Sequence, residues 1–332
     1  MKKGYVLLVL LLSAGFGFAA RLATLPDLVN PETIRIYGDQ MFITDFPRVK
    51  IYSTVDFTLQ KEFGEQGEGP RQFMGSLPGI CVIGDHIIVN SQQKISYYTK
   101  RGEFVKEMKV KAGSNFKPIG DKFVAYGFRE EQKILYQTVN LCDANLEKIK
   151  EIFRQKSWNQ MTQAGYMDVL NIKGYICRVD GDRMVIDGEG GKLYVFDGEG
   201  NRLHSISPDY EKIKVTADDK ERYHHYYKTD PHSAPYYDFM KTRFRFRTYF
   251  PEIRFFDVAD GKIYIMTYKQ RGEDSEFLIY EIGGKFLKRL YLPVAFINAE
   301  DIYPYTVKDD KIYQLIDNPE TEEWELHRFA VE

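Results

Sequence analysis

The feature that most constrains the fold is a short turn that recurs six times, each time directly before an apolar, alternating run. Gly and Asp suit such a turn because both tolerate the positive φ that a two-residue hairpin requires. The six matches are Gly38-Asp39 before M-F-I-T-D, Gly84-Asp85 before I-I-V-N-S, Gly120-Asp121 before F-V-A-Y-G, Gly181-Asp182 before M-V-I-D-G, Asp260-Gly261 before I-Y-I-M-T and Asp309-Asp310 before I-Y-Q-L-I. The sequence therefore predicts six hairpins.

Each hairpin is followed by further strand-like runs. A second alternating segment appears as V-K-I-Y at 49–52, I-S-Y-Y at 95–98, L-Y-V-F at 193–196 and F-L-I-Y at 277–280, and another turn then leads to a fourth strand. Four short strands per copy, with about 40 to 50 residues between copies, are typical of propeller blades. We predict an all-β fold, a six-bladed β-propeller formed as one domain by residues 20–332.

The sixth copy lacks its fourth strand, because the sequence ends at Glu332 soon after the run from Trp324 to Phe329. An unpaired edge would expose backbone amides and carbonyls to solvent or to another chain. The segment Arg21–Leu28, which precedes the first copy, has a suitable length to fill that place. We therefore expect the N-terminal strand to close the ring against the last blade.

Two segments do not fit the blade period. Residues 207–251, between copies four and five, form a partly helical insertion: Thr216 and Asp219 have the spacing of a capping box, and A-D-D-K-E-R-Y-H-H-Y-Y-K follows without Gly or Pro. Phe153–Leu170, around Trp158, Met161 and Met167, has helix-like spacing and predicts a second short helix between copies three and four.

The N-terminus has the pattern of a secretory signal. Lys2 and Lys3 precede an apolar run, and small residues lead to Ala19, with Gly17 two positions before it. The apolar stretch is shorter than the roughly 20 residues that span a bilayer. We expect residues 1–19 to be a signal peptide, and the remaining chain to be periplasmic or extracellular, without a membrane span. A retained anchor is the alternative.

Composition excludes some classes of function. Without Lys2 and Lys3, 44 Lys and Arg remain against 48 Asp and Glu, and no basic block stands out, so nucleic acid is not an expected partner. The three cysteines, Cys81, Cys142 and Cys177, lie in or beside apolar runs with no C-x-x-C spacing. That arrangement indicates buried free thiols rather than disulfides or a zinc site.

With these residues in view, the chain resembles the NHL-type six-bladed β-propellers, and in particular an exported bacterial branch with a G-x-G-P-x-[EQ]-[FY] connector after the first blade. The matching residues here are Gly67, Gly69, Pro70, Gln72 and Phe73. The F-P-E-I segment at 250–253, behind a partly helical insertion, is similar as well. The resemblance implies the fold and an exported protein, but no activity, since most members of that branch have none assigned.

The connector 64–73 and the insertion both lie where the chain crosses between blades, so we expect them on one rim of the propeller, where loops on a rigid scaffold often bind ligands. Polar residues ending the second strands should point to the same rim: Asp45, Asn90, Asp187 and Asp317. These oxygens either accept hydrogen bonds from turn amides or together hold a cation such as calcium. In the connector, Gly67 and Gly69 shape a turn, and Arg71 is a candidate ligand contact.

The insertion is rich in aromatic residues and arginine, the composition favoured at recognition surfaces. The candidate ligand contacts there are Tyr226, Tyr227, Tyr236, Arg243 and Arg245. The alternative is that these rings pack onto the propeller itself. His224 and His225 are adjacent on the expected helix and point about 100° apart, so they cannot bind one metal together.

No G-x-S-x-G elbow is present, and inner-strand histidines of the kind that propeller lyases use are missing. We therefore expect a non-catalytic, monomeric binding protein without a required cofactor, which recognises a protein, peptide or carbohydrate through the insertion-bearing face. The alternative function is a metal-dependent hydrolase or lyase with a calcium-type cation in the central channel.

Overall fold

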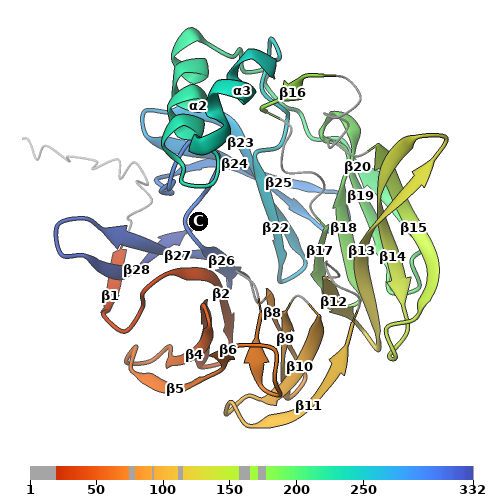
Figure 1. The fold of residues 1–332 in the computed structure, drawn as a ribbon, viewed down its shortest axis with the longest axis vertical. Helices are drawn as coiled ribbons and strands as arrows, with labels where there is room; N and C mark the ends of the chain where they lie inside the picture. Colours follow the sequence, from red (N-terminus) through yellow and green to blue (C-terminus); the bar gives the residue numbers. More distant parts are fainter. Residues whose placement is uncertain are drawn as a thin grey trace, which may run out of the picture.

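The computed structural model describes residues 20–74, 79–91, 93–110, 115–156, 165–170 and 177–331. The expected signal peptide, residues 1–19, lies outside the described residues. Six four-stranded antiparallel sheets surround a common axis (Figure 1), and the six-bladed propeller prediction is confirmed. Among the described residues, none of the helices has the length and apolar character that crossing a membrane would require.

The first three blades follow the chain in order, from the axis outward. Blade 1 contains β2 (Pro31–Tyr37), β3 (Gln40–Asp45), β4 (Arg48–Ser53) and β5 (Leu59–Phe63). Blade 2 contains β8 (Gly79–Ile83), β9 (His86–Ser91), β10 (Lys94–Thr99) and β11 (Phe104–Lys109). Blade 3 contains β12 (Phe116–Ile119), β13 (Lys122–Glu131), β14 (Ile134–Cys142) and β15 (Lys148–Lys156).

The last three blades repeat this order, except at the outermost strand of blade 6. Blade 4 contains β17 (Cys177–Asp180), β18 (Arg183–Asp187), β19 (Leu193–Asp197) and β20 (Arg202–Ile206). Blade 5 contains β22 (Phe255–Ala259), β23 (Lys262–Arg271), β24 (Asp274–Glu281) and β25 (Phe286–Leu292). Blade 6 contains β26 (Tyr305–Lys308), β27 (Lys311–Asn318), β28 (Glu323–Ala330) and, outermost, β1 (Ala20–Leu25).

The N-terminal strand closes the ring, as the sequence predicts. β1 pairs antiparallel with β28, from Ala20 opposite Arg328 to Leu25 opposite Trp324. An ion pair between Arg21 Nη1 and Glu325 Oε1, 2.8 Å apart, fastens the outer edge of this pair. Leu25 is fully buried and belongs to the apolar cluster between blades 6 and 1.

The core is divided among the junctions between blades. The buried side chains of the blades fall into six clusters, one for each of the six junctions around the ring. This division follows from the alternation along each strand, which sends successive side chains to opposite faces of a blade, each face packing against a neighbour. Cys142 and Cys177 are buried in these clusters, Cys81 is half-buried, and all three thiols are free, as expected.

The two faces of the propeller differ in what they carry. Because each blade runs up and down, the connections from an outer strand to the next inner strand emerge on one face, together with the hairpins between second and third strands. We call this the insertion face, because residues 207–254 cross there between β20 and β22. The Gly and Asp turns that open each copy lie on the opposite face.

The connector after blade 1 is a tight turn with a buried anchor. β6 (Glu65–Gln66) pairs parallel with β7 (Gln72–Phe73), and the Gly69 amide donates to Gln72 Oε1 at 2.9 Å. The Phe73 ring is fully buried between blades 1 and 2. Gly64 has a φ of 99°, and a Cβ added to it would lie 2.3 Å from the Phe73 ring and 2.9 Å from the Pro47 carbonyl oxygen.

Gly64→Ala is therefore expected to lower the free energy of unfolding by about 3 kcal/mol, from an unfavourable φ and from displacement of the Phe73 ring. Gly38→Ala is the matched control: its φ is 60°, and no atom lies within 4 Å of an added Cβ. It carries only the φ cost, about 1 kcal/mol. Urea denaturation of both variants measures the difference, and equal losses would contradict the role of Phe73.

The short helix expected within Phe153–Leu170 does not reach the two described ends of that segment. Residues 153–156 continue β15, which pairs with β14 up to Lys156. Met167 lies in β16 (Met167–Asp168), which pairs parallel with β21 (Phe244–Arg245) of the insertion. Strand pairing at both ends outweighs the helix-like spacing of the apolar residues there. Residues 157–164, which include Trp158 and Met161, lie outside the described residues, so a short helix in that part stays a prediction.

Candidate functional site

The insertion begins and ends as a two-stranded base on blade 5. The Val215 amide donates to the Thr248 carbonyl at 3.0 Å, and the Phe250 amide to the Ile213 carbonyl at 2.9 Å. Lys214 and Tyr249 form an isolated antiparallel bridge between them. The two ends of the insertion therefore hold each other, and the residues between them form one projecting arm, which Figure 1 shows beside blade 5.

The first half of the arm is helix α2 (Ala217–Thr229), capped as the sequence predicts. The Asp219 amide donates to Thr216 Oγ1 at 3.1 Å, and the Thr216 amide donates to Asp219 Oδ2 at 2.8 Å. This reciprocal pair is the capping box expected from the Thr216–Asp219 spacing. The second half contains η2 (Ala234–Tyr236), α3 (Tyr237–Met240) and η3 (Lys241–Arg243) before β21.

The arm has an apolar core of its own. Tyr223 and Tyr227 of α2 are buried with Val215 and with Met167, Val169 and Leu170 from the segment before blade 4. Tyr226, Phe244 and Phe246 pack around them. His224, at the edge of this core, shares a 3.0 Å hydrogen bond between its Nδ1 and the Tyr237 hydroxyl. Much of the aromatic content of the insertion thus stabilises the arm itself.

The structure separates the predicted ligand contacts of the arm into two groups. Tyr227 is only 5% exposed and Tyr226 is half-buried, so both belong mainly to the arm core. Tyr236 and Phe239 are each 64% exposed. Arg243 places its Cζ 3.6 Å from the centre of the Phe239 ring and donates from Nη1 to the Phe239 carbonyl at 2.9 Å. We call Tyr236, Phe239 and Arg243 the aromatic patch.

Arg245 lies beyond the patch on β21. Its side chain is exposed, with Cζ 5.9 Å from the centre of the Tyr166 ring. Arg247, two residues further, binds Asp168 Oδ2 through Nε at 2.6 Å and so fastens the arm to the segment before blade 4. Arg247 therefore has a structural role in this run, whereas the guanidinium groups of Arg243 and Arg245 lie over aromatic rings and are available to a ligand.

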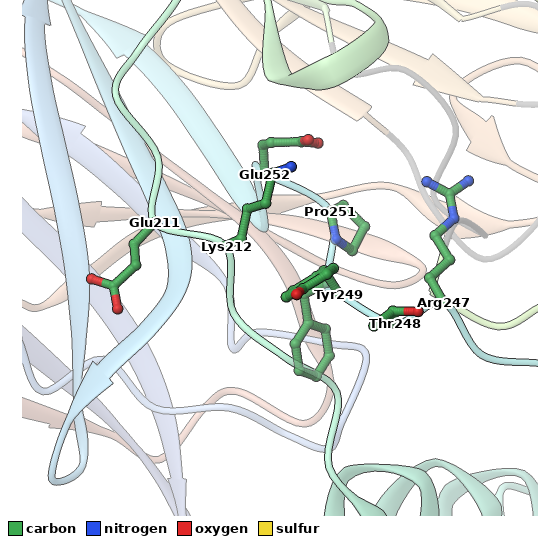
Figure 2. A pocket seen from close by; sticks show the side chains of 8 residues that line it. Glu211, Lys212, Arg247, Thr248, Tyr249, Pro251 and Glu252 are labelled. Carbon is green, nitrogen blue, oxygen red and sulfur yellow. The ribbon is translucent and has the colours of Figure 1, made fainter.

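A pocket of about 250 Å³ lies at the base of the arm (Figure 2). Its walls come from the two strands of the base, since all its lining residues lie in 211–212 and 247–252. Lys212 and Arg247 supply positive charge, and Glu211 and Glu252 supply negative charge, so the pocket is mixed in polarity. Its size suits a single sugar ring or one peptide side chain rather than a large cofactor.

Glu252 connects this pocket with Asp187 at the end of β18. Burial and, to a smaller extent, the nearby charge of Glu252 together raise the pKa of Asp187 to about 7. Gly191, in η1 (Glu189–Gly191), lets Glu252 and Tyr210 pack closely against its backbone. A Cβ added to Gly191 would lie 2.5 Å from Glu252 Cβ and 2.7 Å from the Tyr210 ring. Sequence reasoning missed Glu252, although its place in the F-P-E-I segment was a signal.

The four residues suggested for a cation have separate partners. Asp45 accepts from the Val29 and Asn30 amides and from Lys50 Nζ, which is 2.7 Å from Oδ2. Asn90 exchanges hydrogen bonds with the Phe116 backbone at 2.9 and 3.0 Å. Asp187 lies near Glu252, and Asp317 lies near Tyr303. Across the described ranges, no three His, Cys, Asp or Glu side chains are grouped to hold a metal ion.

Arg71 lines a second pocket, of about 500 Å³, between blades 1 and 2. Its Cζ lies 5.0 Å from the centre of the Phe104 ring, and its amide donates to Glu107 Oε2 at 3.4 Å. Lys61, Arg101, Glu62, Glu65 and Glu103 share the walls, so cations and carboxylates are again mixed. Arg71 and the arm therefore belong to two separate hollows and not to one combined site.

Comparisons with known proteins agree with the fold. No family model and no curated protein matches the sequence. Among solved structures, the protein named "Putative exported protein" from Bacteroides fragilis NCTC 9343 aligns over 95% of this chain and 94% of its own, with 11% identity and a TM-score of 0.53. At that identity the likeness shows the fold alone.

Two further structures are more distant. The β-propeller domain of the Trilobed protease from Pyrococcus furiosus aligns over 91% of this chain and 80% of its own, with 12% identity and a TM-score of 0.44. BamB from Moraxella catarrhalis aligns over 89% and 71%, with 10% identity and a TM-score of 0.33.

Proposed function

We propose that the chain is an exported, non-catalytic binding propeller of the NHL type, which recognises a protein, peptide or glycan through the arm on its insertion face. The N-terminal signal pattern supports export to the periplasm or the cell exterior, and the name of the Bacteroides protein with the same fold agrees with it. The G-E-G-P-R-Q-F connector supports the NHL assignment.

The observation that carries the binding role is the aromatic patch. Two large rings are left in solvent although the same arm has an apolar core that buries other aromatic side chains. Tyr and Arg are enriched among the residues that dominate binding energy, and Phe is enriched at interfaces in general. Arg243, already stacked on Phe239, loses little side-chain entropy when it binds, so the patch is arranged before a partner arrives.

A ligand that contacted both the patch and the base of the arm would be an extended one. Aromatic faces bind sugar rings and apolar side chains, and Arg245 offers donors for carboxylate or hydroxyl groups. The pocket at the base, with Glu252 and Lys212, supplies further polar contacts. This combination supports recognition of a peptide or glycan over a purely apolar partner.

The test compares three immobilised proteins as baits for the envelope fraction and for a glycan array. These are the unchanged chain, Tyr236→Ala with Phe239→Ala, and Val55→Ser, an exposed apolar position in the turn between β4 and β5 on the opposite face. We expect one component to bind the unchanged chain and Val55→Ser, and the double variant to bind it at least about tenfold more weakly.

Thermal melts accompany the binding measurements. Because both rings are exposed, the double variant should melt within about 2 °C of the unchanged chain. Equal binding by all three baits would contradict the assignment of the patch, and so would the absence of any component bound by the unchanged chain.

A further inference from the structure

A second arrangement of charged residues lies away from the arm, at the propeller axis. In every blade, the Gly or Asp turn joins the innermost strand to the second strand. Counting residue pairs between these two strands away from the turn, the third pair lies at the same level along the axis in each blade. Its innermost members are Arg35, Cys81, Lys117, Arg178, Asp257 and Thr306. Each of the six blades therefore contributes one side chain to this level, and three of the six are cationic.

The positive charge is only partly compensated. Arg178 Nε lies 3.3 Å from Asp257 Oδ1, and Asp257 is the carboxylate that faces the cations at this level. Three cations and one carboxylate leave a net charge of +2. Within the part of the chain that the structure describes, Arg178 Nε is buried and has no hydrogen-bond partner, since its contact with Asp257 lacks the geometry of a hydrogen bond.

The cations are close enough to interact. Burial and, to a smaller extent, the charges of Arg178 and Arg35 together lower the pKa of Lys117 to about 8. Cys81 and Cys177 also face Lys117, and the Tyr126 ring lies below its ammonium group. The ammonium donates to the Cys177 carbonyl at 2.8 Å, a hydrogen bond that fixes its position without neutralising it.

A phenol lies beside this level, since Tyr305 precedes Thr306 and pairs with Gln314. Burial raises the pKa of Tyr305, and nearby Asp257 raises it further, while Arg178 and Arg35 act in the opposite direction. Its hydroxyl stays protonated at neutral pH and is available as a hydrogen-bond donor. Tyr305 is therefore a neutral donor among the cations.

These groups remain reachable by solvent. The Arg178 side chain is 26% exposed, and Arg35 and Lys117 are likewise half-buried, although all three belong to innermost strands around the axis (Figure 1). The surrounding protein lowers the pKa of Lys117, yet part of the same side chain remains in contact with water. Both observations hold for side chains that protein largely encloses and that water still partly contacts.

We propose that Arg35, Lys117 and Arg178 bind an oxyanionic group, a phosphate or a carboxylate, at the propeller axis. The planar guanidinium groups present paired donors that match such oxygens, and the Lys117 ammonium adds a point charge. A bound anion also relieves the mutual repulsion of three cations in a poorly solvated space. The site is separate from the arm, so a ligand with an acidic group could occupy it independently.

The experiment titrates the purified chain, in a chloride background, with inorganic phosphate and separately with succinate, by calorimetry. The variants are Lys117→Gln and Arg178→Gln, and the control is Lys285→Gln, which removes an exposed lysine from the turn before β25. We expect saturable binding of at least one probe by the unchanged chain and the control, and at least about tenfold weaker binding by both axial variants. Which probe binds distinguishes phosphate from carboxylate recognition.

The pH dependence gives a second readout. The anion favours charged Lys117, whose pKa in the free protein is about 8, so from pH 7 to 9 the affinity of the unchanged chain should fall relative to that of Lys117→Gln. In Lys117→Gln, the remaining pH dependence includes the ionisation of phosphate itself and lacks the contribution of Lys117. No saturable binding of either probe, or equal affinity in all four proteins, would overturn the proposal. Melts without added anion establish that each variant is folded.

Discussion

Removal of β1, so that the chain begins at Pro26, is expected to lower the melting temperature by more than about 10 °C. The deletion removes the whole β1–β28 ladder and the Arg21–Glu325 ion pair, and it uncovers Leu326 and Leu315 in the cluster between blades 6 and 1. The loss of Leu25 alone is comparable to a Leu→Ala change in a core, about 3 kcal/mol. With the strand pairing added, the total reaches roughly 5 kcal/mol, and each kcal/mol corresponds to about 2–4 °C.

The control is the chain that begins at Ala20, which keeps β1 and lacks only the expected signal peptide. Both forms are melted by circular dichroism at one protein concentration. Size-exclusion chromatography is added, because an open edge on β28 invites pairing between molecules. A melting temperature unchanged by the deletion would show that β1 does not hold the ring together.

Asp257→Asn is expected to lower the free energy of unfolding by about 2 kcal/mol at pH 7 in buffer without phosphate or carboxylates. The change removes the carboxylate beside Arg178 and leaves three neighbouring cations without compensation. Breaking a fully buried pair costs about 3–5 kcal/mol, and the partial exposure of Arg178 reduces that figure. The Asn oxygen can still accept from the Val258 amide, as Asp257 Oδ1 does at 2.9 Å, so local backbone structure is retained.

Asp182→Asn is the matched control, because Asp182 pairs with Arg183 in an exposed turn, where an ion pair contributes well under 1 kcal/mol. Urea denaturation measures both variants. If the axial oxyanion site exists, phosphate or succinate should restore more stability to Asp257→Asn than to the unchanged chain. A loss no greater than that of Asp182→Asn would contradict the interdependence of the axial charges.

The architecture was accessible from sequence because its signals are local. Gly38, Gly84, Gly120 and Gly181 have φ between 52° and 60°, and Asp260, Asp309 and Asp310 between 49° and 53°, the conformations that the turn residues predict. The alternation of apolar and polar residues then predicted the strands of each blade, and the capping-box spacing of Thr216 and Asp219 predicted the start of α2. Closure by β1 followed from counting, since the sixth copy was one strand short.

The remaining features depend on contacts between distant segments. The role of Tyr227 could not be predicted from the aromatic-rich sequence around it. The burial of Tyr227 depends on Met167 and Leu170, which belong to the segment between blades 3 and 4. Asp45, Asp187 and Asp317 look alike in sequence, yet their partners come from different neighbouring loops. Arg35, Lys117 and Arg178 each stand three residues before a turn glycine, a shared offset that becomes meaningful only once six strands converge at one axis.

The pairing of the two chain ends has a consequence for biogenesis. Arg21 and Glu325 are 304 positions apart, so the contact that completes blade 6 cannot form until nearly the whole polypeptide has been made. Long-range pairings of this kind slow folding because the intervening loop must first be ordered. Until β28 has been made, β1 has no strand to pair with, and until β1 then docks, the outer edge of β28 presents unpaired backbone groups that could pair with another chain.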